Sequence, residues 1–452
     1  MKGAFAAALA LGAMVTAPTA AAELFAITKH GDHAPNGCTK PDCTLREAVR
    51  AANAHTGRDR IILPTTGTYV LLRTGTDDNA LRGDLDITGP VRIFHAGGGH
   101  ATIDARGIDR VFEIFPGAAT ELEHLRITGG DHPTSQEGNG GAIHTSANLT
   151  LDHSIVTGNH ARGPDGSGGA IQALGGKLSV LDSQITDNLA AGDSGALDVG
   201  NHGFTIKNST LSGNRASFAG VGYFYGDGES VIGASTFSKN RSTGETGTIY
   251  YSESAGSLFV SRSTFSENAA ATEGGGFSAR NGDVKMVNVT IAGNRAGAEG
   301  GGIWILSPVT LNAVTVARNV SDSDEAGGEQ GSGLYLAAPG IPVKVHNTIV
   351  ALNRVGSGQR NDCAGDPFMS LGHNLLSTLG PTATCQGFDE TSDLVNAHPR
   401  LDDLAKNGGK TKTIALRKGS PAIGHADPAT APARDQRGVL RKDPDTGAFE
   451  RR

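Results

Sequence analysis

Short segments in which apolar and polar residues alternate follow one another along most of this 452-residue chain, in a recurring order. Each unit starts with a Gly-Gly turn and an apolar strand, continues with a second apolar strand ending in Ser or Thr, and closes on Asn. The pattern is clearest in residues 140–159, 168–188, 275–294 and 301–319. Self-similarity with a period of about 26 residues predicts a stack of near-identical coils.

The closing asparagines follow one another too closely for a crossover helix in each repeat. Parallel strands normally need a connection of a dozen or more residues, usually a helix. We therefore expect an all-β, single-stranded parallel β-helix over residues 59–355, in which the chain returns to itself through turns. The closing residues are Asn159, Asn188, Asn214, Asn240, Asn268, Asn294, Asn319 and Asn353.

The repeated polar residues are expected to be scaffold. Asn at a turn adopts left-handed backbone angles, and asparagines on successive coils can bond to one another as an internal ladder. The Ser/Thr column is interpreted in the same way, because a repeated serine is a poor candidate for a unique nucleophile. That column comprises Ser154, Ser183, Ser209, Ser235, Ser263 and Thr290.

The two ends of the chain differ from the repeats. Residues 1–22 combine a lysine, an apolar run and three alanines, which predicts a signal peptide cleaved after Ala22 and a secreted or cell-surface protein. The apolar run is too short for a membrane span. Residues 23–58 are expected to cap the first coil: Thr44 and Glu47 form a capping box, and a short amphipathic helix follows to about Ala54.

Composition limits the classes of binding partner that we expect for this chain. The formal charge of −7 and the low aromatic content argue against a nucleic-acid partner, and no later segment is apolar enough to span a membrane. In an exported protein the four cysteines are interpreted as two local disulfides. The expected pairs are Cys38 with Cys43 and Cys363 with Cys385.

Functional candidates lie in the one column whose residue type changes from coil to coil. Inward residues are expected at Ile143, Ile171, Leu197, Phe224, Ile249, Phe277 and Ile303. Because strand side chains alternate faces, the residue after each of them points outward. The resulting outer column reads His144, Gln172, Asp198, Tyr225, Tyr250, Ser278 and Trp304. Seven coils about 4.8 Å apart give a strip on the order of 30 Å long, enough for an extended polymer.

The strip suits sugar binding. Tyr225, Tyr250 and Trp304 offer aromatic faces for sugar rings, and Gln172 can bond hydroxyl groups. The alternative is that these aromatics only stabilise the sheet surface.

Catalytic candidates are fewer. Asp198, His144 and the loop residue Glu137 offer acid or base groups, although polar loop residues are commonly solvated turns. The acidic sequences at 83–86 and 321–325 cluster oxygen ligands that suit calcium, but neither matches an EF-hand loop or the nonapeptide of calcium-binding β-rolls, so no metal site and no cofactor are expected.

Both ends carry motifs that resemble a known family. The segment CTLREAVRAAN at 43–53 looks like the N-terminal CSLREA-type signature. The tail resembles the choice-of-anchor Q domain at 408–427, 435–439 and 445–450. The resemblance implies a right-handed parallel β-helix on an exported bacterial protein, with residues 356–452 docked on the helix end. It implies no reaction, and the chain stops after this domain, which suggests release or non-covalent retention at the surface.

Three functions remain open. The first is a monomeric secreted or cell-surface protein that binds an extended polymer, which we expect to be a polysaccharide. The second is a carbohydrate-active enzyme on the same face, a polysaccharide lyase or glycoside hydrolase, and the third is a structural spacer or adhesin. A compact acid, base and cation group over the strip would favour the enzyme.

Overall fold

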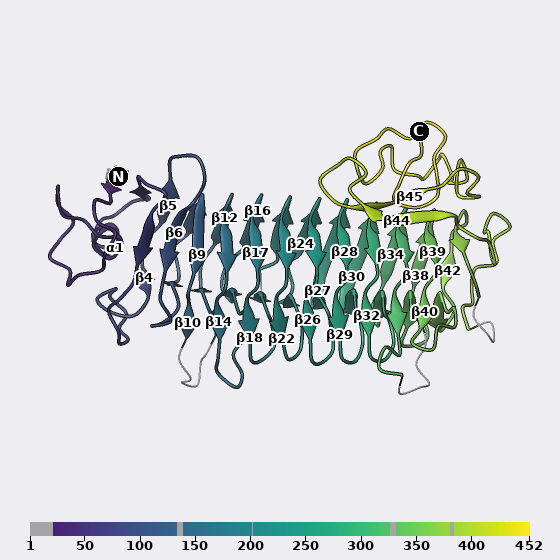
Figure 1. The fold of residues 1–452 in the computed structure, drawn as a ribbon, viewed down its shortest axis with the longest axis horizontal. Helices are drawn as coiled ribbons and strands as arrows, with labels where there is room; N and C mark the ends of the chain where they lie inside the picture. Colours follow the sequence, from purple (N-terminus) through teal and green to yellow (C-terminus); the bar gives the residue numbers. More distant parts are fainter. Residues whose placement is uncertain (1–20, 133–138, 201, 326–330, 380–383) are drawn as a thin grey trace, which may run out of the picture.

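The chain forms an elongated stack of about eleven coils, and its strands pair in parallel from one coil to the next (Figure 1). The computed structural model describes residues 21–132, 139–200, 202–325, 331–379 and 384–452. It confirms the predicted right-handed parallel β-helix. A complete coil has a first and a second strand in one large sheet, a third strand in a second sheet, and a two-residue fourth strand.

The large sheet holds the first and second strands. The first strands are β4 (Leu85–Ile87), β7 (Phe112–Ile114), β11 (Ile143–Thr145), β15 (Ile171–Ala173), β19 (Leu197–Gly200), β23 (Gly222–Gly226), β33 (Ile303–Ile305), β37 (Leu334–Leu336) and β41 (Cys363–Gly365). The second strands are β1 (Leu24–Ala26), β2 (Asp59–Leu63), β5 (Val91–His95), β8 (Thr120–Glu123), β12 (Leu149–Asp152), β16 (Leu178–Leu181), β20 (Phe204–Lys207), β24 (Glu229–Gly233), β34 (Val309–Asn312), β38 (Val343–His346) and β42 (Met369–Ser370). Two long strands span both positions, β27 (Ile249–Ser261) and β30 (Phe277–Val287).

The other two sheets complete each coil. The third strands are β3 (Thr68–Val70), β6 (Ala101–Asp104), β9 (Leu125–Thr128), β13 (Ile155–Thr157), β17 (Gln184–Thr186), β21 (Thr210–Ser212), β25 (Thr236–Ser238), β28 (Thr264–Ser266), β31 (Thr290–Ala292), β35 (Thr315–Ala317), β39 (Ile349–Ala351) and β43 (Leu375–Leu376). The fourth strands are β10 (Asp131–His132), β14 (His160–Ala161), β18 (Leu189–Ala190), β22 (Arg215–Ala216), β26 (Arg241–Ser242), β29 (Ala269–Ala270), β32 (Arg295–Ala296), β36 (Val320–Ser321) and β40 (Arg354–Val355).

The interior of the stack is apolar, with one buried polar ladder along it. Each predicted inward residue from Ile143 to Ile303 is fully buried. The closing asparagines are at most 1% exposed, and each side-chain amide donates to the side-chain oxygen of the next, for example Asn240 Nδ2 to Asn268 Oδ1 at 3.0 Å. The ladder ends on a carboxylate, because Asn353 Nδ2 donates to Asp362 Oδ1. The predicted Asn ladder is thus confirmed.

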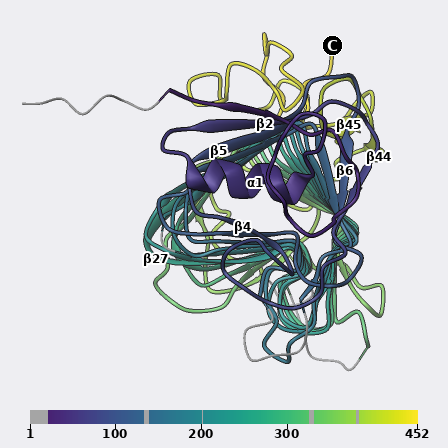
Figure 2. The ribbon, with the colours of Figure 1, turned by 90° about the vertical axis from the view of Figure 1, so that its left-hand side faces the viewer.

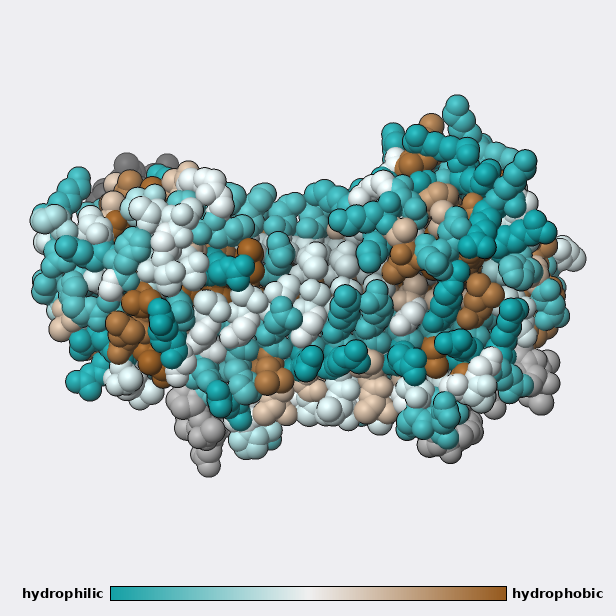
Figure 3. Space-filling model, in the orientation of Figure 1, coloured by the Kyte–Doolittle hydropathy of each residue, from teal (hydrophilic) through white to brown (hydrophobic). Residues whose placement is uncertain are grey.

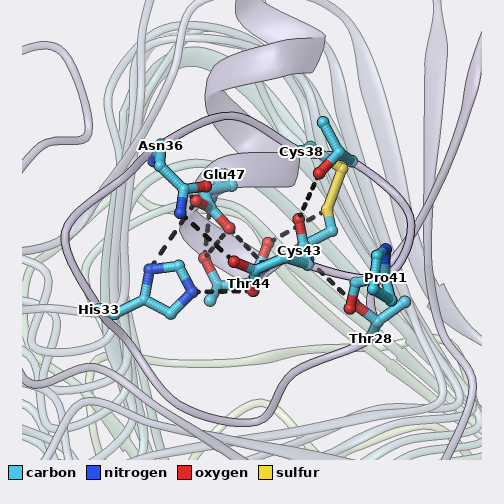
Figure 4. Close-up of a disulfide and its surroundings, with 10 residues drawn as sticks. Thr28, His33, Asn36, Cys38, Pro41, Cys43, Thr44 and Glu47 are labelled. Carbon is cyan, nitrogen blue, oxygen red and sulfur yellow. Dashed lines mark hydrogen bonds and ion pairs between the residues drawn. A yellow bond between two sulfur atoms is a disulfide. The ribbon is translucent and has the colours of Figure 1, made fainter.

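A helix closes the first coil (Figure 2). Helix α1 (Leu45–Ala54) starts at Thr44, and the predicted capping box with Glu47 is present. Arg46 is fully buried and pairs with Asp32 at 2.7 Å, which fixes the helix over the coil end. The Cys38–Cys43 disulfide lies beside this cap (Figure 4). The second predicted disulfide, Cys363–Cys385, is also formed.

The C-terminal segment lies along the side of the helix. Coil pairing continues beyond residue 355, through β41, β42 and β43, and the chain then folds back over the third strands. The hairpin β44 (Leu401–Ala405) and β45 (Thr413–Leu416) packs there on small residues such as Ala317. We had predicted that this segment docks on the end of the β-helix. It packs on the side instead, because alanines in the last third strands leave an apolar surface for its side chains.

Asn240→Ala should destabilise the whole stack. The substitution removes the donors to Leu211 O and Asn268 Oδ1 and the acceptor for Asn214 Nδ2. Leaving buried groups unpaired costs about 1–3 kcal/mol each, so we expect urea denaturation to give a loss of about 2–4 kcal/mol in the free energy of unfolding. The exposed residue Asn79 supplies the control, and an Asn240→Ala protein as stable as Asn79→Ala would contradict a ladder that stabilises the fold.

Candidate functional site

The first strands carry one outward residue per coil, and strand register aligns these residues in a column. The register confirms the outward positions predicted from His144 to Asp198, and at Tyr250, Ser278 and Trp304. It also extends the column in both directions, beyond the coils used in the sequence alignment. The outward column reads Asp86, Glu113, His144, Gln172, Asp198, Tyr223, Tyr250, Ser278, Trp304 and Tyr335.

One predicted member was wrong. Asp198 pairs with Tyr223, whereas Tyr225 lies two residues further along the strand and pairs with Gly200. The reason is Gly222, which occupies the inward position that Leu197 and Ile249 fill in the neighbouring coils. A Cβ on Gly222 would lie 2.6 Å from the ring of Phe224, so that ring already fills the space and the alignment on apolar residues slipped by two positions.

The column is less exposed than the sequence suggested. Gln172, Asp198 and Trp304 are only 5%, 4% and 6% exposed, whereas His144 and Tyr250 are half-buried. The loops that connect each fourth strand to the next first strand lie beside the column, as shown by the contacts of Phe218 with the tyrosines. The outward column therefore forms the floor of a strip and not a flat open surface.

Trp304 is covered by a cation. The Arg280 guanidinium lies 3.4 Å from the Trp304 ring and 4.9 Å from the Tyr250 ring. The same group is held by Glu245 and Glu273 at 2.9 and 2.5 Å. Because one face of the indole is occupied, Trp304 cannot offer the sugar-stacking surface predicted for it unless Arg280 moves.

The accessible aromatic surface lies two to three coils away from Trp304. Tyr223 is the centre of a group of rings, with centroids 4.9 Å from Tyr225, 5.3 Å from Tyr250 and 5.8 Å from Phe218. All four side chains are half-buried. The Tyr225 ring lies over Gly200, where a Cβ would come within 2.8 Å of it. We call Phe218, Tyr223, Tyr225 and Tyr250 the tyrosine group; sequence analysis had placed Tyr223 close to the strip but outside the column, and it had missed Phe218.

A buried carboxylate adjoins the tyrosine group. Asp198 Oδ2 accepts a hydrogen bond from Gln172 Nε2 at 2.8 Å, and Oδ1 meets no hydrogen-bond partner in good geometry among the described residues. Burial raises the pKa of Asp198, and hydrogen bonds from Gln172 and from the nearby Ser167 hydroxyl partly oppose that shift. Buried polar atoms are rarely left unpaired in proteins, so Oδ1 accepts either from Ser167 or from a ligand hydroxyl on the strip.

A second polar group forms the other end of the column. His144 Nδ1 lies 3.4 Å from Glu113 Oε1, and Arg110 bonds both Glu113 and Asp84, at 3.2 and 2.9 Å. The pKa of Glu113 is lowered, chiefly by the hydrogen bond from His144. Sequence analysis missed Glu113 and Arg110, although extending the alignment back to the strand at 112–114 would have placed Glu113 beside His144.

The predicted catalytic residues do not come together. His144 and Asp198 are two coils apart, roughly 10 Å, so they cannot act on the same atom. Glu137 lies outside the described residues. A compact acid and base pair exists instead between Glu113 and His144.

One set of carboxylates could hold a cation by its spacing. Ligand oxygens of Asp84, Asp86 and Glu113 lie within 4.8 Å of one another. Arg110 donates to two of these three side chains, so its guanidinium already supplies the neutralising charge. The arrangement is an ion-pair network with a surplus of carboxylates, and desolvation raises the pKa of Asp86 to about 7.

Comparison with known proteins adds a likeness of fold alone. No family model and no curated relative matches the chain. A solved structure described as pectate lyase Pel9A is similar at 14% identity and a TM-score of 0.49, covering 96% of this chain and 98% of its own. At that identity and score the likeness carries no argument about activity. Among the described residues, no helix is long and apolar enough to cross a membrane.

Asp86→Asn should flatten the pH dependence of stability. Asp86 is fully buried, and a pKa of about 7 in the folded state means that the folded protein holds this proton above pH 4, where the unfolded chain releases it. Stability is therefore lost as pH rises from about 4 to about 7, by at most about 4 kcal/mol from this group. Melting temperatures measured from pH 4 to 8 should fall less in Asp86→Asn than in the parent. The exposed Asp78→Asn is the control, and equal pH profiles for Asp86→Asn and the parent would refute the raised pKa.

Proposed function

We propose that this protein is an exported β-helix that binds an extended polysaccharide along the outward column. The observation that carries the proposal is the tyrosine group beside Asp198 and Gln172 on consecutive coils. Aromatic faces pack on the C–H faces of sugar rings, while carboxylate and amide groups bond the hydroxyls. Because Tyr223 and Tyr250 lie on neighbouring coils, a sugar chain bound on their rings would run along the axis of the β-helix.

Unpaired polar atoms along the strip support a polar ligand. Four buried side-chain atoms of the column and its cover, Asp86 Oδ1, Asp198 Oδ1, Arg280 Nε and Trp304 Nε1, meet no hydrogen-bond partner in good geometry among the described residues. Two of them, Asp198 Oδ1 and Trp304 Nε1, are an acceptor and a donor on the same line of residues. A polymer rich in hydroxyl groups can satisfy both kinds of atom.

The proposal that the protein is exported rests on separate observations. Two disulfides fit an oxidising compartment, and the motifs that resemble the CSLREA-type signature and the choice-of-anchor Q domain fit a bacterial surface protein. The predicted signal peptide falls almost entirely on residues 1–20, outside the described residues. We propose a monomer in the extracellular space or on the cell surface.

The alternative is a carbohydrate-active enzyme on the same strip. The Glu113–His144 pair favours it, because a half-buried imidazole held by a carboxylate can act as a general base or acid. Arg110 pairs with Glu113 and Asp84, so it would neutralise the carboxylate of a uronic acid only by exchanging one of these partners. Polysaccharide elimination needs these two roles together, which the tyrosine group by itself cannot supply.

Removing the rings should weaken polysaccharide binding. In titrations against a panel of soluble polysaccharides, we expect Tyr223→Ala and Tyr250→Ala each to lower the affinity for the bound polymer about fivefold to tenfold, because each ring contributes about 1–1.5 kcal/mol. Phe259→Ala is the matched control, since Phe259 is 41% exposed on a second strand outside the column. If the tyrosine variants bind as well as Phe259→Ala, the column is not the binding face.

The enzyme alternative is tested on the same panel. Lyase activity would give unsaturated chain ends that absorb in the ultraviolet, and hydrolysis would give reducing ends. If either product forms, Glu113→Gln and His144→Gln should each lower the rate at least a hundredfold, as expected for loss of general acid or base catalysis. Asp198→Asn should mainly weaken binding. Turnover that survives His144→Gln would exclude this pair as the catalytic group, and neither binding nor turnover would favour a structural spacer.

A further inference from the structure

The third strands form a separate face that carries rows of hydroxyl groups. Their outward side chains align in two rows, two residues apart along each strand. The register places Thr157, Thr186, Ser212, Ser238 and Ser266 in one row. Thr210, Thr236, Thr264, Thr290 and Thr315 follow one another in the other row. Thr290 therefore lies on this outward row and not in the serine column predicted for it, because Val289 occupies the position that follows Ser263 there. Neighbouring members of a row are about 4.8 Å apart, and the two rows are separated by roughly 7 Å.

Part of this face is already a binding surface within the molecule. The C-terminal segment covers it from β28 onward, and the threonine row bonds that segment directly. Thr264 Oγ1 donates to Lys412 O at 2.6 Å, Thr290 Oγ1 donates to Gln436 Oε1 at 2.6 Å, and Thr315 Oγ1 accepts from Ala448 N at 3.0 Å. The row therefore offers one hydroxyl per coil, and it bonds three separate stretches of the C-terminal segment, at Lys412, Gln436 and Ala448.

The covering hairpin runs along the helix axis. Lys412 lies over the coil of Thr264, whereas Asp402 on the partner strand bonds Arg318 two coils further on (Figure 1). Its tip points toward the uncovered coils, where Lys410 reaches Asp182 at 3.4 Å. A chain that continued in the same direction would lie on the uncovered part of the two rows.

The uncovered coils differ from the covered ones in a way that identifies their occupant. Under the C-terminal segment the row of Ser238 and Ser266 continues as Ala292, Ala317 and Ala351, which pack against the apolar side chains of that segment. The uncovered part keeps hydroxyls. We call Thr186, Thr210, Ser212, Thr236 and Ser238 the hydroxyl face; all five are half-buried.

The hydroxyl face has free bonding capacity. Within the described part of the chain, the hydroxyls of Thr210, Ser212, Thr236 and Ser238 bond no other protein group, and Thr186 bonds only Thr157, at 3.1 Å. In Figure 3 the middle of the molecule, between the first coils and the C-terminal segment, shows side chains of intermediate hydropathy with hydrophilic ones above and below them. The C-terminal polypeptide uses the alanines for its apolar side chains as well as the threonine hydroxyls, whereas a neutral sugar chain can be held by hydroxyl partners and by small methyl groups against its C–H faces.

We propose that the hydroxyl face binds a neutral, extended polysaccharide, laid along the helix axis as a continuation of the C-terminal hairpin. This site is distinct from the outward column, because the two lie on different sheets of the coil. The chain then holds polysaccharide on two sides, one lined by rings and carboxylates and the other by hydroxyls and methyls.

The test measures depletion of the folded protein from solution by cellulose particles, with hydroxyethyl cellulose as soluble competitor. The parent is expected to bind and to be released by the competitor. The double variant Thr210→Arg/Thr236→Arg should lower the partition at least tenfold, and Thr210→Val/Thr236→Val, which keeps the shape of the strand, threefold or more. Thr205→Arg, at a half-buried outward site on a second strand, is the control and should bind as the parent does.

Each other outcome would overturn the proposal. No depletion of the parent by cellulose means that the face does not bind this class of polymer. Depletion unchanged in both double variants places the polymer elsewhere, and loss in Tyr223→Ala/Tyr250→Ala alone assigns it to the outward column. That last result would leave the proposed function standing while removing the second site, so the two failures are distinguishable.

Discussion

The fold depends on the constraint that every coil must meet its neighbour at the same closing turn. The side-chain amide of each asparagine in the ladder donates to the side-chain oxygen of the next asparagine and to a backbone carbonyl of the preceding coil, as in Asn240. Its backbone N–H donates to that same side-chain oxygen, and all of these groups are buried. A change in coil length can be absorbed only between two asparagines, as in the 34-residue step from Asn319 to Asn353. The ladder therefore fixes strand register, and register decides which outward residues become neighbours.

This constraint explains why the fold was predictable and the site only partly so. Glycine turns, serines and asparagines recur with the period of the coil, so the parallel stack could be predicted from sequence. The capping box and the local cysteine pairs in turn predicted the capping helix and both disulfides. The members of the outward column can be predicted only where the repeats are aligned correctly with one another. At Gly222 the inward residue is missing and Phe224 fills its place from the next inward position. Apolar periodicity cannot reveal that exchange, because both arrangements keep the same face inward.

Exposure was the other property that sequence could not give. A residue that points outward from a strand is exposed only if no other segment covers it, and loops from the fourth strands border the column. Arg280 lies over Trp304 because Glu245 and Glu273, from two successive loops, hold its guanidinium there. Three residues distant in sequence thus decide whether one indole is available. The same applies to the third strands, where the C-terminal segment covers Thr290 and leaves Thr210 open.

The uneven distribution of charge along the outward column bears on what it can do. The first coils bury Asp84, Asp86 and Asp109 beside Arg110, and desolvation raises the pKa of all three carboxyl groups. Arg110 and the raised pKa of these carboxyl groups relieve the surplus negative charge at that end. The middle coils carry neutral rings with a single carboxylate. His144 lies three coils from Tyr223 and pairs with Glu113 on the next coil. Whether a sugar chain bound on the rings also contacts this acid and base pair then depends on how far the bound polymer extends along the column.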